Sequence, residues 1–153
     1  MLRELLDDGE VTPRNGWGFA LTPALRDFFE SGDDEELADV AFTDAARTSL
    51  RLLSEHDGPF PHRRVVIAAD VEAEPEPDMG EAVVRIAGVV PRDAVAAVHV
   101  DLAQAEPLVE KAVAVVDAAD LGDEDAELTV GDALEHELAW YAPQELPMLV
   151  ELL

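Results

Sequence analysis

The chain has 153 residues and carries 35 acidic against 10 basic side chains, a formal net charge of −25. It contains no cysteine, which excludes disulfide scaffolds, cysteine-based zinc sites and thiol nucleophiles. The negative field disfavours binding to nucleic acid or to an anionic membrane, and no apolar run is long enough for a transmembrane helix. We therefore predict a cytoplasmic protein without a cofactor, folded as one domain over residues 1–153.

The acidic composition has three possible explanations, which the sequence leaves open. GC-rich codons in a bacterial genome favour Ala, Arg, Asp, Glu, Gly, Pro and Val over Lys, and Lys111 is the only lysine of the chain. A salt-rich cytoplasm selects acidic surfaces as well. The third explanation is an acidic partner surface, which binds a basic protein or mimics nucleic acid.

Turn residues divide the first third of the chain into short elements. A helix is predicted over residues 2–8, because Gly9 is a typical C-terminal helix cap. Asn15-Gly16 predicts a turn. Thr22-Pro23 combines a capping hydroxyl with proline at the first helical position, and so predicts a helix that follows directly. A short strand over residues 18–21 is expected between the turn and this helix.

Two longer helices are predicted, over residues 35–56 and 107–119, and the first is expected to break near Thr43. Both have apolar residues at the spacing 0, 4, 7, 8 and 11, which places these residues on one helix face. The stripes are Phe42, Ala46, Ser49, Leu50 and Leu53, and Leu108, Ala112, Val115, Val116 and Ala119. Two helices of this kind are expected to cover one face of a sheet.

Three segments rich in Val and Ile predict strands after a break at residues 58–62. They cover residues 63–71, 81–90 and 93–101. The linkers between them are too short for crossover helices, so an antiparallel meander of neighbouring strands is expected. The linker EAEPEPD (72–78) is predicted to be extended and mobile.

The tail is less regular. Residues 119–127 are expected to form a solvated acidic loop or a helix end, residues 133–141 are compatible with helix or strand, and residues 143–153 predict a short helix. The predicted fold class is α+β, with a mainly antiparallel sheet and helices packed on one face.

His136-Glu137 begins like the zinc-peptidase motif H-E-x-x-H, but Trp140 stands where the second histidine is required. We therefore predict no catalytic role for this pair on the motif alone, and expect Trp140 and Tyr141 to be core anchors.

The alternative to a binding protein is an enzyme with a histidine and carboxylate site. His99 and Asp101 point to the same side of a predicted strand, and together with His136 or Glu137 they would form a possible metal set. Against this, a buried His99 and a turn-capping Asp101 explain the same pattern.

A second alternative is a small-anion site at basic residues that stand out in so acidic a chain. The candidates are His62, Arg63, Arg64 and Arg85. Clustered arginines bind anions or carboxylates well. Neutralisation of nearby acids of the same chain is the competing explanation.

Five segments together resemble an uncharacterised family of small acidic proteins from GC-rich bacteria: GFALTPALRDFF, DAARTSLRLL, RRVVIAADV, DAVAAVHVD and the tail from AADLGDEDA to ELPMLV. The resemblance implies no assigned activity, and so no catalytic residue. It also implies a short strand before the segment LRELLDDG, which this chain lacks, either through a late start or through loss of the strand. The leading hypothesis is a non-catalytic interaction or regulatory domain whose acidic surface binds a protein with a basic surface.

Overall fold

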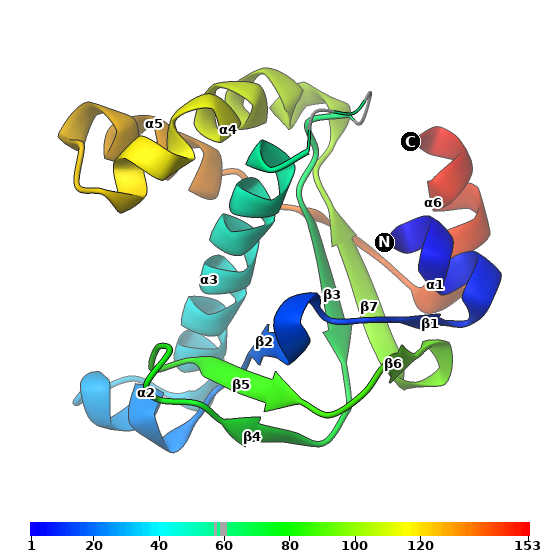
Figure 1. Cartoon of the computed structure of the whole chain (residues 1–153), viewed down its shortest axis with the longest axis horizontal. Helices are drawn as coiled ribbons and strands as arrows, with labels where there is room; N and C mark the ends of the chain where they lie inside the picture. Colours follow the sequence, from blue (N-terminus) through cyan, green and yellow to red (C-terminus); the bar gives the residue numbers. More distant parts are fainter. Residues whose placement is uncertain (57, 59–60) are drawn as a thin grey trace.

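The computed structural model describes residues 1–56, 58 and 61–153, and has helices and antiparallel strands interspersed along the chain (Figure 1). The predicted α+β class with antiparallel sheets is confirmed. The α-helices are α1 (Leu2–Asp8), α2 (Pro23–Phe28), α3 (Asp34–Ser54), α4 (Glu106–Asp120), α5 (Glu124–Leu134) and α6 (Leu146–Leu152). The strands are β1 (Glu10–Val11), β2 (Trp17–Phe19), β3 (Val65–Ala69), β4 (Ala73–Pro75), β5 (Val83–Ile86), β6 (Val90–Pro91), β7 (Val95–Val100) and β8 (Ala139–Tyr141). The predicted break at residues 58–62 lies partly outside the described residues.

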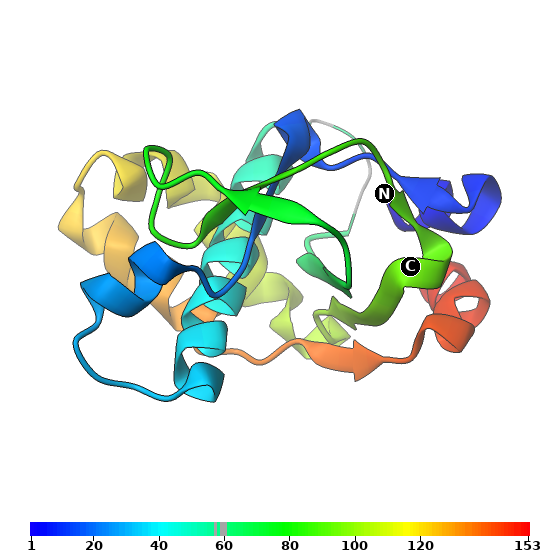
Figure 2. The same ribbon diagram turned by 90° about the horizontal axis from the view of Figure 1, so that it is seen from below.

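A sheet with the order β3-β7-β8 is the part of the fold that positions the candidate sites. β3 and β7 are antiparallel, with Val65 opposite Val100. Val98 and Val100 point into a core that contains the buried leucines of α1 and α6. These two helices therefore cover one face of the sheet, as the views in Figures 1 and 2 show.

The other face of this sheet is covered by α3. The Asp33 side chain accepts a hydrogen bond from Glu36 N and caps the helix, and acidic residues in the first turn favour the positive end of the helix dipole. The helix runs without the predicted break, and Thr43 lies on its exposed side. Helices thus lie on both faces of β3-β7-β8, whereas the prediction placed them on one.

Small side chains hold α4 and α5 against α3. Leu50 of α3 is fully buried against Ala105, which directly precedes α4, and against residues of the other two helices, which are Val109, Ala112, Val116, Ala119, Ala126, Val130 and Ala133. The expectation that the helix over 107–119 would cover the sheet was wrong. Its apolar stripe instead packs against the alanine and valine stripe of α5. The two helices follow each other in the chain and lie side by side (Figure 1).

The predicted three-strand meander was also wrong. β5 pairs with β2 and β4 in a second sheet, so that it does not lie between β3 and β7. The segment 72–78, expected to be a mobile linker, contains β4, which pairs with β5 through a local hairpin. Gly18 in β2 allows close approach to β5, since a Cβ at this position would lie 2.8 Å from Ile86 Cδ1.

The turns and caps near the start are formed as predicted. Gly9 ends α1 with φ of 72°, and Asn15 and Gly16 both have positive φ in the turn before β2. The Thr22 hydroxyl accepts a hydrogen bond from Leu25 N and caps α2. Within the described residues, no helix is both long and apolar enough to cross a membrane.

Candidate functional site

Arg64 and Asp101 form a buried ion pair at one end of the central sheet. Arg64 precedes β3 and Asp101 follows β7, so that the antiparallel register brings them opposite each other. Arg64 Nε and Nη2 donate to the two carboxylate oxygens of Asp101, each at 2.8 Å, and both side chains are completely buried. The Arg64 main-chain N also donates to Asp101 Oδ2 at 2.7 Å. The pair therefore locks the two strand ends together.

The same arginine connects the sheet to the segment after α5. Arg64 Nη2 donates to the main-chain oxygen of His136 at 2.9 Å. Its other terminal nitrogen, Nη1, is buried and has no hydrogen-bond partner among the described residues. Arg64 thus holds the connection between α5 and β8 in place.

The predicted anion-binding residues are not gathered in one cluster. Arg64 is paired with Asp101, and Arg63 Nε donates to Glu106 Oε1 at 2.7 Å. Arg85 lies in β5 of the other sheet, where its Nε donates to Glu76 Oε1 at 2.8 Å. His62 is partly buried just before these arginines. In this arrangement, each of the three arginines neutralises a carboxylate of the chain itself.

The predicted histidine and carboxylate set is likewise divided. His99 lies on the α3 side of β7, and its ring meets the Phe42 ring edge to face at a centroid distance of 4.8 Å. Burial of the imidazole lowers its pKa below the ordinary value of 6.5. Asp101 is committed to Arg64, and His136 is connected to that pair only through its main-chain oxygen.

The part of the chain that the structure describes contains no arrangement of side chains suited to a metal ion. No group of three or more His, Asp and Glu side chains there is arranged to hold a metal ion.

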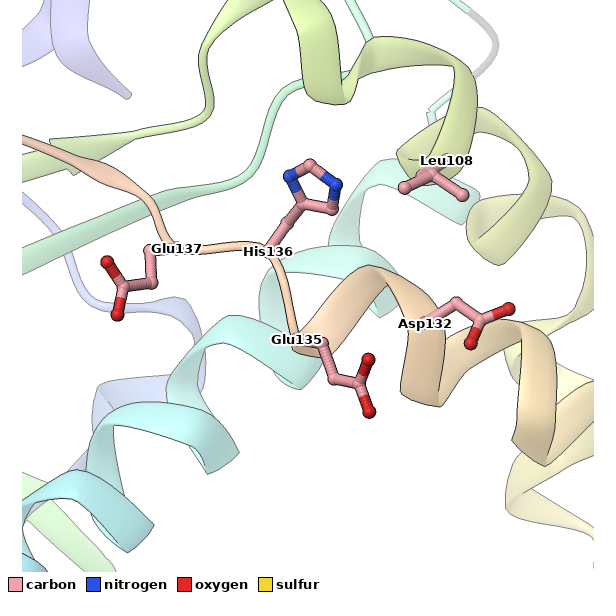
Figure 3. Close-up of a pocket in the computed structure, with 5 residues that line it drawn as sticks. All are labelled: Leu108, Asp132, Glu135, His136 and Glu137. Atoms are coloured by element: carbon pink, nitrogen blue, oxygen red, sulfur yellow. The ribbon is translucent and has the colours of Figure 1, made fainter.

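An open groove of about 640 Å³ lies where the end of α5 faces the start of α4 (Figure 3). Leu108 of α4 lines one side, and Asp132, Glu135, His136 and Glu137 line the other. Figure 3 shows the His136 ring extending toward Leu108, with the three carboxylates spread along the end of α5 and the segment after it. The groove is acidic, with one apolar wall.

The outer face of α5 adjoins this groove through Asp132 and Glu135. Asp123 caps the helix by accepting a hydrogen bond from Ala126 N at 2.9 Å, and Ala126, Val130 and Ala133 face the core. The opposite side consists of Asp125, Leu128, Asp132 and Glu135, all exposed, and is called the acidic α5 face below. Their spacing of three or four residues places them in one row. Leu128 is 70% exposed, and Leu121 just before the helix is 89% exposed.

On the side of α4 and α5 that faces α3, acidic residues are paired with arginines. Arg47 of α3 donates to Asp120 and Glu127, and Arg51 donates to Asp120. These bonds lower the pKa of Asp120, mainly through Arg51, and the pKa of Glu127, mainly through Arg47. Among the described residues, no ion pair neutralises Asp125, Asp132 or Glu135 of the acidic α5 face.

The helix that carries this face was not among the predicted elements. Residues 119–127 were expected to form a loop or helix end, but α4 continues to Asp120 and α5 begins at Glu124. The available signal was Asp123 as a capping residue before small apolar residues at helical spacing. The acidic residues were read as solvated loop because their charge concealed this pattern.

Trp140 was expected to be a core anchor, but it is 61% exposed. β8 is the last strand of its sheet, and Trp140 is paired with His99 on the side of α3. Tyr141, on the opposite side, does pack against the core formed with α1 and α6. The alternation of a strand therefore turns the two aromatic residues to opposite faces of the sheet, where Tyr141 is partly buried and Trp140 lies beyond the part that α3 covers.

Comparisons with known proteins give a family and no activity. No curated protein matches the chain, and no solved structure matches it. A family model described as "Family of unknown function (DUF6912)" matches residues 1–150. The match covers the acidic α5 face, the groove and β8, and we conclude that the chain belongs to this family of unknown function.

Proposed function

We propose that this protein is a non-catalytic cytoplasmic interaction module that binds a basic segment of another protein. The observation that supports the proposal best is the acidic α5 face, which has unpaired carboxylates and leads into the groove beside Leu108. A surface with carboxylates and isolated apolar side chains suits a partner that alternates cationic and apolar residues.

The charge of the whole chain supports the same type of partner. A net charge of −25 attracts basic proteins over distances of about a Debye length, roughly 10 Å at 0.1 M salt. Attraction of this kind raises the rate of association and has little selectivity. Selectivity therefore has to come from local contacts, for which Leu128, Leu121 and Leu108 provide exposed or partly exposed apolar surface.

The experiment is a binding titration with two synthetic peptide libraries. One contains 12-residue peptides of Arg, Lys, Leu and Ser, and the other replaces the basic residues by Asp and Glu. Binding to the ¹⁵N-labelled protein is followed by chemical shifts at low and at moderate salt. We expect binding of basic peptides only, weakened by salt, with shifts at the acidic α5 face.

A matched pair of variants separates local recognition from net charge. Asp132→Asn with Glu135→Gln removes two carboxylates from the acidic α5 face, and Glu72→Gln with Glu74→Gln removes two exposed carboxylates elsewhere. The first pair is expected to weaken binding by about five- to tenfold, because two surface charge contacts contribute up to about 1 kcal/mol each. Equal weakening by both pairs, or no binding of basic peptides, would refute the proposal.

A further inference from the structure

β8 has an outer edge that is open in the structure. The sheet order is β3-β7-β8, and β8 pairs with β7 along one side only. Figure 2 shows β8 at the margin of the molecule, without another element beyond it. No hydrogen bond among the described residues joins the main chain of Ala139–Tyr141 to any element other than β7. Its outward N–H and C=O groups are therefore available to a further strand.

The side chains of β8 do not protect this edge. Exposed edge strands are usually kept very short, or are blocked by charged residues, by proline or by a bulge, which prevents pairing with other chains. β8 is short, with three residues, but has none of the other three devices. β8 consists of Ala139, Trp140 and Tyr141, and its pairing with β7 is regular. An uncharged edge of this type is competent to pair with an extended peptide.

Trp140 provides a side-chain contact next to this edge. Its ring lies on the α3 side of the sheet, opposite His99, which packs on Phe42 of α3. The helix covers β7 at this point and leaves Trp140 61% exposed. An exposed indole binds apolar side chains and, through its ring face, Arg or Lys.

Charge determines which extended segment fits here. The chain enters β8 directly from the groove, so that Glu135 and Glu137 precede the strand and are both exposed. A second copy of this chain, paired through β8, would bring the same carboxylates and the same net charge of −25 close together. Charge complementarity instead favours a basic segment.

We propose that an extended Arg- or Lys-rich segment of the protein partner adds to β8 as a fourth strand of this sheet. Its main chain pairs with the outer edge of Ala139–Tyr141, and one of its basic side chains lies over Trp140. Neighbouring basic side chains reach Glu135 and Glu137. The inference rests on the proposed function for the basic character of the partner, and adds the binding mode, which is strand addition.

The test uses the whole chain and a defined eight-residue peptide that alternates Arg or Lys with Val. The control peptide has the same sequence with N-methyl groups on two adjacent central residues. Since neighbouring N–H groups of a strand point to opposite sides, this control loses a donor on each edge and keeps all side chains. We expect the unmodified peptide to slow hydrogen exchange of outward β8 amides at least tenfold, and the control to bind at least tenfold more weakly.

Two variants test the role of the indole. Trp140→Ala is expected to weaken binding of the unmodified peptide about five- to tenfold. Phe28→Ala, which removes another exposed aromatic side chain at the end of α2, is expected to leave binding unchanged. Both positions are exposed, so thermal unfolding of the two variants is expected to match that of the unmodified protein.

The outcomes distinguish this inference from the proposed function. Binding that is insensitive to N-methylation and to Trp140→Ala, with shifts confined to the acidic α5 face, overturns strand addition and leaves the proposed function standing. No binding of any basic peptide overturns both. A concentration-dependent dimer with protected β8 amides in the absence of peptide would assign the edge to a second copy and overturn the basic occupant.

Discussion

Arg64 and Asp101 show how a single residue pair fixes the relation of separate elements. The arginine donates to the Asp101 carboxylate and to the His136 main chain, so that one buried side chain connects β3, β7 and the segment before β8. Removing charge from water costs several kcal/mol per ion, and a bidentate partner is needed to offset it. The groove and the β8 edge therefore depend on this pair for their position.

Asp101→Ala is expected to lower the free energy of unfolding by about 3–5 kcal/mol, because it leaves the Arg64 guanidinium buried without its anionic partner. Urea denaturation followed by circular dichroism measures the change. The double variant Arg64→Met with Asp101→Leu is the control and is expected to recover most of the loss. A cost below about 1 kcal/mol for Asp101→Ala would show that the pair is not a major determinant of stability.

His99 is expected to titrate below its ordinary pKa of 6.5, because burial disfavours the imidazolium. As the pH falls from about 6.5 toward the lowered pKa, the unfolded chain binds the proton first, and the folded state loses stability. Above pH 6.5 this contribution is fully present. NMR titration of the ring protons gives the pKa, and His99→Gln is expected to reduce the loss of stability on acidification in this range. A measured pKa at or above 6.5 would contradict the assignment.

At the scale of elements, α4 and α5 are held to α3 by a combination of small apolar side chains and two arginines. The fully buried Leu50, Val109 and Val130 fill the interface, while Arg47 and Arg51 bind acidic residues at its edge. Two groups among the acidic residues of α4 and α5 thus differ in their surroundings. Those on the inner side are paired, and those on the acidic α5 face are free to meet a partner.

Asp120→Asn is expected to reduce the free energy of unfolding at pH 7 by about 1 kcal/mol, because Asp120 accepts hydrogen bonds from both Arg47 and Arg51. Its pKa in the folded state is below 3.8, so its contribution is present above that pH and is lost as the pH falls further, through the lowered pKa. Chemical denaturation between pH 2.5 and 7 measures this. Between pH 4 and 2.5, the free energy of unfolding of Asp120→Asn should fall less steeply than that of the unmodified protein. Asp117→Asn, at an exposed position of α4, is the control and should behave like the unmodified protein.

At the scale of the whole molecule, the fold joins two three-stranded sheets and a helical layer in a strongly acidic chain. The core is built from Ala, Val and Leu, which pack closely but bury modest areas each. The net charge of −25 opposes compaction through repulsion between like charges. Both properties make stability sensitive to the screening of charge.

The melting temperature is expected to rise by several degrees between 10 mM and 0.5 M KCl. The Debye length falls from about 30 Å to a few ångström over this range, which weakens the repulsion within the folded state. Differential scanning calorimetry measures the shift, and an equal osmolality of a neutral solute is the control. A melting temperature that falls with KCl would mean that the partly exposed ion pairs of Arg47 and Arg51, which salt screens, outweigh the repulsion.

Local sequence patterns determined the local features of this protein. The helix caps at Gly9 and Thr22 and the turn at Asn15-Gly16 form as predicted. Backbone conformation and helix capping depend on a few adjacent residues, so a local pattern is enough to predict them. The apolar spacing also predicted the helices α3 and α4, although α3 has no break and Val109 is buried in α4 where the prediction had Leu108. The α+β class followed from the number and type of these elements.

Tertiary structure alone decided strand pairing, the helix layers and the candidate sites. β5 pairs with β2, which is distant in sequence, and the apolar pattern of a strand does not specify its neighbour. The acidic α5 face exists because Ala126, Val130 and Ala133 pack against α3 and α4, which turns the acidic residues outward. Trp140 is exposed because β8 is an edge strand. The position of a strand in its sheet depends on long-range pairing, and the residues of β8 carry no local signal for that position.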